Sequence, residues 1–399
     1  MMYKRTVERL LESVDIRVIE KESEKRRDWD MVVRNPICYK RFLREGSLGL
    51  ARTFIDGDWD TIDLVQFYRK VIKNDLRGKV KRDFPALSLG LLAKIMKPDI
   101  LIRDIIWKLK PLITNPQNRR LSQRVAKQHY DLGNELYSRM LGSTMAYTCG
   151  VFKRIGKDEL VSDLDEAQNT KFELVGRKAK LKPGMKVLDV GCGWGGLANY
   201  LAENFRVSVV GYNISHEQIK YAKEHNHNNV RFEEKDYRDA VDDSDKPFDV
   251  IVSIGNLEHV GRKNYRKYMK LIDNLLVPSG RLITHFIARK DSVSPGVVDR
   301  FIGTDIFPGG EHPSLAQILK AAEGLFIPEH VQNIGPDYAL TLRCWWRNLS
   351  SKEREYSTKT LKRFQIYLNM CEAGFLERAI QLYQIVFSKG IPERYDIVV

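Results

Sequence analysis

A glycine-rich turn near the middle of the chain has residue types suited to ligand binding. The stretch runs Val187-Leu-Asp-Val-Gly-Cys-Gly-Trp-Gly-Gly196, and a helical pattern from Leu197 to Glu203 follows it. Glycine allows backbone angles that side chains forbid, so such a turn can approach a ligand closely. The next helix directs its N-terminal N–H groups toward the same place. The chemistry predicted here is the binding of a nucleoside-containing cofactor.

The spacing of the glycines narrows the choice of cofactor. Gly191-x-Gly193-x-Gly195 is tighter than the dinucleotide pattern G-x-G-x-x-G, and Asp189 ends the preceding apolar strand. This pattern favours S-adenosylmethionine over NAD. The candidate cofactor-binding residues of this turn are Asp189, Gly191, Cys192, Gly193, Trp194, Gly195 and Gly196.

Two later strand ends are expected to complete the cofactor site. The second strand ends without the carboxylate that usually holds the ribose hydroxyls, so Asn213 or Gln218 would have to replace it. After the third strand, a carboxylate and an aromatic ring could bracket adenine. The candidates at these two strand ends are Asn213, Ile214, Ser215, Gln218, Asp236 and Tyr237.

A carboxylate and an imidazole follow the fourth and fifth strands. Glu258 comes shortly after Phe248–Ile254, and His285 ends the run Gly280–His285. The carboxyl ends of parallel strands face one crevice, so both side chains should lie beside the cofactor. An unpaired buried carboxylate is costly, which predicts a functional pair. The neighbouring His259 is expected to point elsewhere.

Alternating apolar strands and helices must position these residues. Further strands are predicted at Val207–Gly211 and Val230–Glu233, and helices at 160–181, 215–225 and 264–276. This alternation predicts an α/β fold with a doubly wound, mostly parallel sheet, as in Rossmann-like class I S-adenosylmethionine-dependent methyltransferases. Residues 1–30 and 356–390 are each predicted to be helical, and Gly57-Asp58-Trp59 a tight bend with a buried aromatic ring.

Composition and charge suggest two domains with different partners. The chain has 399 residues and 43% hydrophobic content, and its five cysteines form no C-x-x-C pair, so neither a disulfide framework nor a metal site is expected. The first residues lack the apolar core of a signal peptide. Residues 1–130 hold 29 Lys and Arg against 17 Asp and Glu, a net +12, whereas residues 131–399 carry +2. Such asymmetry indicates a polyanionic partner, either nucleic acid or an anionic membrane surface.

The stretch 84–112 is apolar but interrupted by Lys, Arg and Asp. It is too charged to cross a bilayer, and it is equally compatible with helices in a membrane interface and with helices packed on the catalytic domain. The polar segment 111–120 contains two prolines and is predicted to be a linker. We therefore expect a smaller, mainly helical and basic N-terminal domain over residues 1–115 that binds lipid or a membrane, and a catalytic domain over residues 116–399.

A set of short motifs resembles the cyclopropane fatty acid synthases, over about Gly46 to Gly390. The motifs are His129-Tyr-Asp-Leu-Gly-Asn134, Met145-x-Tyr-Thr-Cys-Gly150, the glycine-rich turn, Glu258-His-Val-Gly261, Ile306-Phe-Pro-Gly-Gly310 and Tyr338-x-x-Thr-Leu342. The stretch from Gly46 to Trp59 is similar to the N-terminal lipid-binding domain of the bacterial phospholipid-modifying members.

The resemblance implies that the sulfonium methyl of S-adenosylmethionine is attacked by a cis double bond in a phospholipid acyl chain. A carbocation results, and bound bicarbonate takes a proton as the cyclopropane ring closes. The implied bicarbonate cage is Glu258, His285 and Tyr338 with groups at Cys149, Gly255 and Ile287, and Tyr147 and Thr148 are implied cofactor contacts. Cys371 matches a cysteine that has been assigned a catalytic role in the family by analogy. A cysteine on a helix with an apolar face, as predicted here, more often packs in the hydrophobic core.

The resemblance also implies a cytoplasmic protein that is peripheral on the inner face of a bacterial membrane, with the N-terminal domain on the anionic surface and a homodimer possible. Three alternatives remain. One is an acyl-chain methyltransferase of the same fold that leaves a methyl or methylene branch. Another is an RNA methyltransferase that uses the basic region, although 84–112 offers aliphatic side chains rather than stacking rings, so no nucleic acid is expected. A membrane-binding module without activity would leave the glycine-rich turn and Glu258 unexplained.

Overall fold

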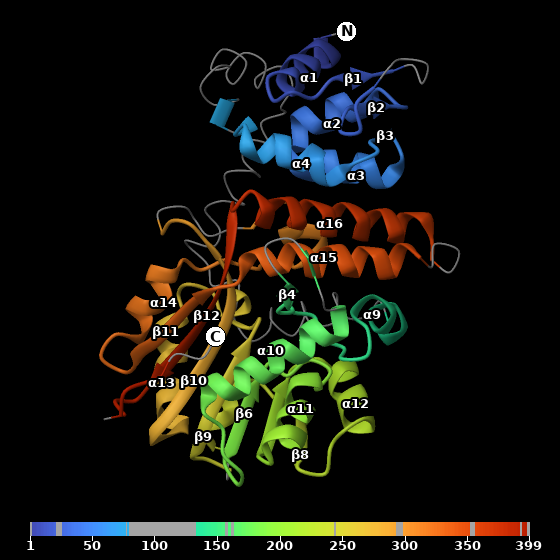
Figure 1. Cartoon of the computed structure of the whole chain (residues 1–399). Coiled ribbons are helices and arrows are strands. Elements are labelled where there is room, and N and C mark those ends of the chain that lie inside the picture. The colour runs from blue at the N-terminus through green and yellow to red at the C-terminus, as the bar shows by residue number, and fades with distance from the viewer. Residues whose placement is uncertain are drawn as a thin grey trace. The chain divides into compact units, whose positions relative to one another are not determined.

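The computed structural model divides the chain into two compact units (Figure 1). It describes residues 2–20, 26–76, 78–79, 133–155, 159–160, 163–242, 245–292, 298–351, 356–391 and 393–396. The first unit takes the described residues of Met1–Thr114, Val297–Pro308 and Trp345–Ala379, and the second those of Asn115–Gly296, Gly309–Cys344 and Ile380–Val399. The stretch 84–112, the linker 111–120 and the residues 129–132 lie outside the described residues.

The chain therefore crosses between the units several times, whereas the sequence suggested a single boundary near residue 115. Helix α15 (Gly335–Ser350) begins in the second unit and ends in the first. Helix α16 (Thr358–Leu376) belongs to the first unit, where Glu377 just beyond it accepts an ion pair of 2.6 Å from Arg69 of α4 (Leu64–Lys73). Side-chain packing of this kind joins segments about 300 residues apart and leaves little trace in local sequence patterns.

A seven-stranded sheet forms the centre of the second unit. Its order is β11-β12-β10-β9-β6-β7-β8. The strands are β6 (Lys186–Val190), β7 (Ser208–Asn213), β8 (Val230–Glu234), β9 (Phe248–Ile254), β10 (Leu276–Arg289), β11 (Ile327–Asn333) and β12 (Ile380–Ser388). Strands β6 to β10 run parallel, and β12 is antiparallel to both β10 and β11. The predicted mostly parallel, doubly wound sheet is confirmed.

Helices cover both faces of this sheet (Figure 1). On one face lie α10 (Leu164–Ala179), α11 (Gly196–Phe205) and α12 (His216–Glu224), and on the other α13 (Tyr265–Leu275) and α14 (Leu315–Ala322). Neighbouring strand residues alternate between the two cores: Val187 and Val250 pack with α10 and α11, whereas Leu188 and Ile251 pack with α13. Burial on both faces explains why these strands read as continuous apolar runs.

The prediction that residues 356–390 are helical throughout is wrong for their second half. Helix α16 ends at Leu376, Arg378 takes a positive φ of 55°, and β12 follows. Strand β12 pairs with β10 over nine residues, from Arg281↔Ser388 to Arg289↔Ile380. A short apolar run cannot be assigned to strand or helix by periodicity alone, and here the open edge of β10 decides the conformation.

Three short strands and the helices around them build the described part of the first unit. The elements are α1 (Met2–Glu12), α2 (Ile37–Glu45), α3 (Ser47–Asp56), α4, α16, β1 (Val18–Ile19), β2 (Met31–Val33) and β3 (Trp59–Asp60). The prediction of one helix over residues 1–30 is wrong, because α1 ends at Glu12 and Asp15 adopts a φ of 64°. The predicted bend at Gly57 is confirmed: its φ is 83°, and the fully buried Trp59 donates its indole N–H to the Leu50 carbonyl at 2.9 Å.

The remaining described elements are short. They are α9 (Asn134–Leu141), β4 (Arg154–Ile155), β5 (Glu159–Leu160), the 3-10 helices Tyr237–Asp242 and Leu257–His259, and the π-helix Ile302–Ile306. In the first unit, Asp305 of the π-helix forms a 2.8 Å ion pair with Arg52 of α3. None of the helices in the described part of the chain is both long and apolar enough to cross a membrane.

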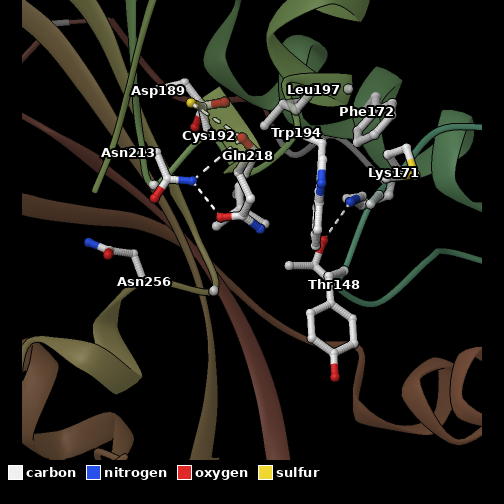
Figure 2. Close-up of a pocket in the computed structure, with 18 of the residues that line it drawn as sticks. Thr148, Lys171, Phe172, Asp189, Cys192, Trp194, Leu197, Asn213, Gln218 and Asn256 are labelled. Atoms are coloured by element: carbon white, nitrogen blue, oxygen red, sulfur yellow. Dashed lines mark hydrogen bonds between the residues drawn. The ribbon is translucent and has the colours of Figure 1, made fainter. Parts of the chain in front are cut away.

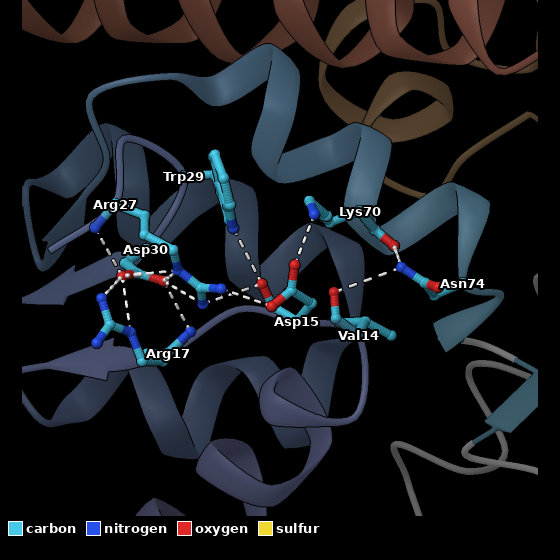
Figure 3. A network of polar contacts seen from close by, with 8 residues as sticks. All are labelled: Val14, Asp15, Arg17, Arg27, Trp29, Asp30, Lys70 and Asn74. Carbon is cyan, nitrogen blue, oxygen red and sulfur yellow. Dashed lines mark hydrogen bonds and ion pairs between the residues drawn. The ribbon is translucent and has the colours of Figure 1, made fainter.

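A buried carboxylate organises the polar contacts of the first unit (Figure 3). Asp30 is 1% exposed and accepts hydrogen bonds from the backbone N–H groups and guanidinium groups of Arg17 and Arg27. Arg27 and Lys70 also lie against the ring of Trp29, at 5.1 and 4.6 Å from its centroid. Burial alone would raise the pKa of Asp30, but the donors on Arg27 and Arg17 outweigh it and lower this pKa to about 2.

Protonation or removal of this charge is expected to destabilise the protein. Since the pKa of Asp30 falls from 3.8 to about 2 on folding, its contribution is complete above pH 4 and is lost as the pH falls toward 2. We expect Asp30→Asn to lower the free energy of unfolding at pH 7 by about 2 kcal/mol. Urea unfolding of both proteins at pH 7 and pH 3 checks this, with the exposed Glu12→Gln as the control. A deficit that stays unchanged at pH 3 would contradict the charge-based explanation.

Candidate cofactor pocket and active site

A pocket opens at the place where the strand order of the sheet reverses. Strand β6 lies between β7 and β9, so the chain after β6 continues to one side and later returns to the other. The glycine-rich turn after β6 and the segment Ile254–Asn256 after β9 both line the pocket. Crevices at such reversal points are the usual ligand sites of open α/β sheets.

Eleven of the candidate cofactor-binding residues line this pocket (Figure 2). They are Tyr147, Thr148, Asp189, Gly191, Cys192, Gly193, Trp194, Gly196, Asn213, Ile214 and Gln218. The other lining residues are Met145, Ala146, Lys171, Phe172, Leu197, Ile254, Gly255, Asn256 and His259. His259 was expected to point elsewhere, and this is wrong: the 3-10 helix Leu257–His259 turns the chain so that Asn256 and His259, three residues apart, both reach the pocket.

Four candidates do not line the pocket. Gly195 has a φ of 89°, and a Cβ there would meet Phe232 at 2.5 Å, so this glycine serves close packing of the turn. Ser215 precedes α12 and is buried. The carboxylate of Asp236 accepts hydrogen bonds of 2.8 and 2.6 Å from the guanidinium of Arg238, and Tyr237 packs edge-on against Tyr268.

The polar groups of the pocket fit a ligand that has both hydrogen-bond donors and apolar parts. Asp189 is 2% exposed, and its Oδ2 has no hydrogen-bond partner among the described residues. Burial raises the pKa of Asp189 to about 7, and the charge of Lys171 opposes the rise. On another wall, Gln218 accepts a 2.6 Å hydrogen bond from Asn213, whose Oδ1 accepts from the Ile214 N–H at 2.8 Å (Figure 2). An amine or hydroxyl beside Asp189, with aromatic walls from Trp194 and Phe172, suits S-adenosylmethionine.

Four of the cage candidates come together at the ends of β9 and β10. The N–H of Gly255 donates to the His285 carbonyl at 2.7 Å, and the N–H of Ile287 donates to Oε1 of Glu258 at 2.7 Å. Among the described residues, neither Oε2 of Glu258 nor either ring nitrogen of His285 has a hydrogen-bond partner. Buried polar atoms without partners are rare in folded proteins, so this cluster is suited to a small polar ligand.

Burial sets the protonation states of this cluster. Glu258 is 8% exposed, and burial raises its pKa to about 7 although the Ile287 N–H opposes the shift. At neutral pH the carboxyl group can therefore both take up and release a proton. Burial, together with the charges of Lys171 and Lys178, lowers the pKa of His285 well below 6.5, so the imidazole is neutral and has one N–H to donate.

Helix α15, which carries Tyr338, contacts the segment of Cys149 through Thr341. Thr341, one turn beyond Tyr338, accepts a 3.0 Å hydrogen bond from the Gly150 N–H, and its hydroxyl lies 3.8 Å from the sulfur of Cys149. Cys149 is fully buried and Tyr338 is 9% exposed. Burial raises the pKa of the Cys149 thiol well above 9.0, so the thiol is protonated at neutral pH and is not an activated nucleophile.

Cys371 lies in the first unit, on α16. It is half-buried, and burial together with the charge of Asp299 raises its pKa to about 12. The thiol is therefore protonated at neutral pH.

The sequence interpretation missed two buried lysines of α10. Lys171 donates to the Thr148 hydroxyl at 2.8 Å and lines the pocket. Lys178 donates to the side-chain oxygens of Gln332 and Gln384 at 2.5 and 2.6 Å and does not line it. Their spacing of seven places both on the apolar stripe that holds Phe172 and Val175, and this placement was the available signal.

Comparison with known proteins identifies the family. The model of the mycolic acid cyclopropane synthetase family matches residues 117–385, which is more than half of the chain. The chain belongs to this family. The cyclopropane-fatty-acyl-phospholipid synthase of Escherichia coli is 39% identical over 367 residues, covering 91% of this chain and 88% of that protein.

Further relatives support the same conclusion. The S-adenosylmethionine-dependent methyltransferase UmaA of Mycobacterium tuberculosis is 34% identical over 281 residues, covering 65% of this chain and 95% of that protein. The crystal structure of the mycolic acid cyclopropane synthase CmaA1 complexed with SAH and CTAB has a TM-score of 0.60 and 30% identity, covering 67% of this chain and 98% of that one. This member of the cyclopropane synthetase family is thus an S-adenosylmethionine-dependent methyltransferase with the class I fold.

Proposed function

We propose that this enzyme converts cis double bonds in the acyl chains of membrane phospholipids into cyclopropane rings. The similarity to the Escherichia coli synthase carries this proposal, because it extends over 91% of the chain and so includes both the first unit and the catalytic unit. The unpartnered polar atoms of Glu258 and His285, at strand ends beside a pocket suited to S-adenosylmethionine, support it.

The residues of the pocket bind and orient the methyl donor. When bound, S-adenosylmethionine supplies an electrophilic methyl group on a sulfonium. The carboxylate of Asp189 would accept from donors of this ligand, and the ring of Trp194 is fixed by its 2.9 Å hydrogen bond to Asn134. Asn213 and Gln218 hold each other in place on the opposite wall. The pocket therefore positions its ligand with side chains whose own conformations are already set.

The base that completes the ring is proposed to be bicarbonate held by the cluster of Glu258, His285 and Tyr338. One oxygen of Glu258 is occupied by the Ile287 N–H, which leaves Oε2 to accept the proton of bicarbonate. The neutral imidazole of His285 donates its single N–H to the anion, and the phenol of Tyr338 is a second donor. Groups at Cys149, Gly255 and Ile287 form the walls of this cage.

The chemistry then requires only a weak base. Bound S-adenosylmethionine would supply the methyl carbon to which the π electrons of the double bond form the new bond, and the electrons of the carbon–sulfur bond would stay on sulfur. Bicarbonate in the cage would supply the weak base for the proton that leaves the new methyl group, so that the freed electron pair closes the ring. Oε2 of Glu258 would accept the proton that bicarbonate gives up in turn. Because the pKa of Glu258 is about 7, this carboxylate can accept the proton and later release it at neutral pH.

The first unit is proposed to dock on the inner face of a bacterial membrane as a peripheral domain. Residues 1–130 carry a net charge of +12, and the first unit exposes Ile37 and Ile62, which are 49% and 60% accessible. Basic side chains attract anionic lipids, and exposed aliphatic side chains can enter the headgroup region. A homodimer stays a prediction.

Cys371 is expected to take no part in the reaction. Since burial holds its thiol protonated, we expect Cys371→Ser to keep the rate of ring formation within about two-fold of the wild-type rate. Initial rates on phospholipid vesicles check this, with the thermal midpoint of unfolding measured on the same sample. A fall of more than about ten-fold with an unchanged midpoint would give Cys371 the catalytic role that its analogues were assigned.

The proposed function is tested by incubating the purified chain with S-adenosylmethionine, bicarbonate and vesicles of a cis-unsaturated phospholipid. We expect released fatty acids that are heavier by one CH₂ group and resist hydrogenation. A product of the same mass that takes up hydrogen would instead indicate an exocyclic methylene branch. Cofactor binding without any lipid product would overturn the proposal and direct attention to RNA.

A further inference from the structure

Lys171 is a buried lysine on the wall of the cofactor pocket. Its side chain, on α10, is 1% exposed and lies beside the ring of Phe172, 4.4 Å from the ring centroid (Figure 2). Lys171 is the single Lys or Arg among the described residues that line the pocket. Burial lowers the pKa of Lys171 to about 7, although the charges of Cys149 and Asp189 oppose the shift. A buried ammonium is costly unless an anion compensates it, so an anion bound nearby would favour the charged form of Lys171.

The contacts of Lys171 connect the pocket to the cage. Its Nζ donates to the Thr148 hydroxyl at 2.8 Å, and the neighbouring Gln168 donates to the Thr148 carbonyl at 2.7 Å. The methyl group of Thr148 lies against Gly255, where an added Cβ would meet it at 3.0 Å. Thr148 lines the pocket, and the next residue is Cys149 of the cage. Side chains of α10 therefore hold the segment that forms a wall of both sites.

The charge of Lys171 reaches the acidic and cage groups around it. Burial dominates the pKa values of Asp189, Cys149 and His285, and in each case the charge of Lys171 acts as well. Asp189 lines the same pocket as Lys171, and bound bicarbonate would add another negative charge beside it. A bound anion needs a nearby positive charge to offset its loss of water.

We propose that Lys171 is a positioning residue of the reaction: its ammonium provides the positive charge that retains bicarbonate in the cage, and its hydrogen bond to Thr148 fixes the wall that separates anion from methyl donor. This inference rests on the proposed function and assigns a residue to its anion site. The proposed role requires a positively charged side chain at position 171. A purely structural role would require only a side chain that fills the volume of Lys171.

Four variants separate charge from packing. Lys171→Met removes the charge and keeps much of the volume, and Lys171→Arg keeps the charge. Thr148→Val removes the hydroxyl acceptor and leaves the ammonium. Lys178→Met is the control for loss of a buried lysine from α10. Lys178 is fully buried and does not line the pocket, and its charge acts on the pKa of His285 less than the charge of Lys171 does.

The readouts are the KM for bicarbonate, the kcat for ring formation and the affinity for S-adenosylmethionine measured by calorimetry. We expect Lys171→Met to raise the bicarbonate KM about ten-fold or more and to change cofactor affinity far less. Lys171→Arg should restore most of the bicarbonate affinity. Thr148→Val should lower the affinity for S-adenosylmethionine, because Thr148 lines the cofactor pocket and loses the hydrogen bond from Lys171. Lys178→Met should raise the bicarbonate KM by no more than about three-fold.

Two outcomes would overturn the inference. One is a Lys171→Met enzyme with a wild-type bicarbonate KM. The other is an equal rise of the bicarbonate KM in Lys171→Met and Lys178→Met, because a general loosening of α10 would then explain both effects. If Lys171→Met does not fold, Lys171→Gln replaces it in the experiment, because glutamine keeps a hydrogen-bond donor for Thr148. We expect the same rise of the bicarbonate KM in that variant. A wild-type enzyme that forms rings without responding to bicarbonate would contradict the proposed base and with it this inference, whereas an absence of rings would contradict the proposed function.

Discussion

Glu258→Gln is expected to abolish most ring formation while cofactor binding continues. The amide oxygen of glutamine can still accept the Ile287 N–H, which Glu258 accepts at 2.7 Å, so the local structure should persist. The NH₂ group would replace Oε2, the oxygen without a partner among the described residues, and cannot take up a proton. Loss of a positioned acid or base lowers kcat by about 10² to 10⁴, and we expect a fall in this range.

The measurement is kcat on unsaturated phospholipid vesicles at fixed bicarbonate concentration, together with calorimetric binding of S-adenosylmethionine. Glu311→Gln is a matched control: Glu311 is also a buried glutamate of the second unit, and its carboxylate accepts the Arg262 N–H at 3.1 Å. This control should keep kcat within about three-fold. If the kcat of Glu258→Gln is close to that of the wild-type enzyme, Glu258 takes no part in proton transfer.

Gly196→Ala is expected to weaken cofactor binding more than any other single methyl group added to the turn. Gly196 is the first residue of α11, and a Cβ there would collide with the backbone carbonyl oxygen of Thr144. Thr144 directly precedes the pocket-lining residues Met145 to Thr148, and a backbone atom cannot swing aside as a side chain can. Overpacking of this kind costs about 1–3 kcal/mol, which corresponds to a loss of affinity of about 5- to 150-fold if it falls on the bound state.

Calorimetric titration with S-adenosylmethionine checks the effect, and thermal unfolding reports how much of the cost falls on stability. Gly184→Ala is the control. Gly184 lies in the exposed turn before β6 at a φ of 86°, and a Cβ there would meet nothing within 4 Å. That variant should lose a little stability because of its backbone angle and keep its cofactor affinity. Equal losses of affinity in the two variants would contradict the explanation based on Thr144.

Local patterns in the sequence determined most of the catalytic unit. The strand Phe248–Ile254 was predicted with the bounds it has, and the helices predicted at 215–225 and 264–276 differ from α12 and α13 by one residue at each end. These elements can be predicted from the sequence because β-branched runs, glycine turns and helix periodicity are properties of neighbouring residues. The strand-end rule likewise placed Asp189 and Glu258 at the correct edge of the sheet.

Tertiary structure decided what depends on partners distant in sequence. Strand β12 exists because β10 offers an edge, Asp236 is held by Arg238 and does not line the pocket, and α16 packs on the helices of the first unit. The protonation states of Glu258 and His285 also depend on tertiary structure, since they follow from burial.

The fold class, the family resemblance and the candidate residues of the site could all be predicted from the sequence. Only the tertiary structure decided which of those residues share a pocket and that Lys171 lies among them, because long-range packing fixes burial and neighbours, which no local periodicity encodes.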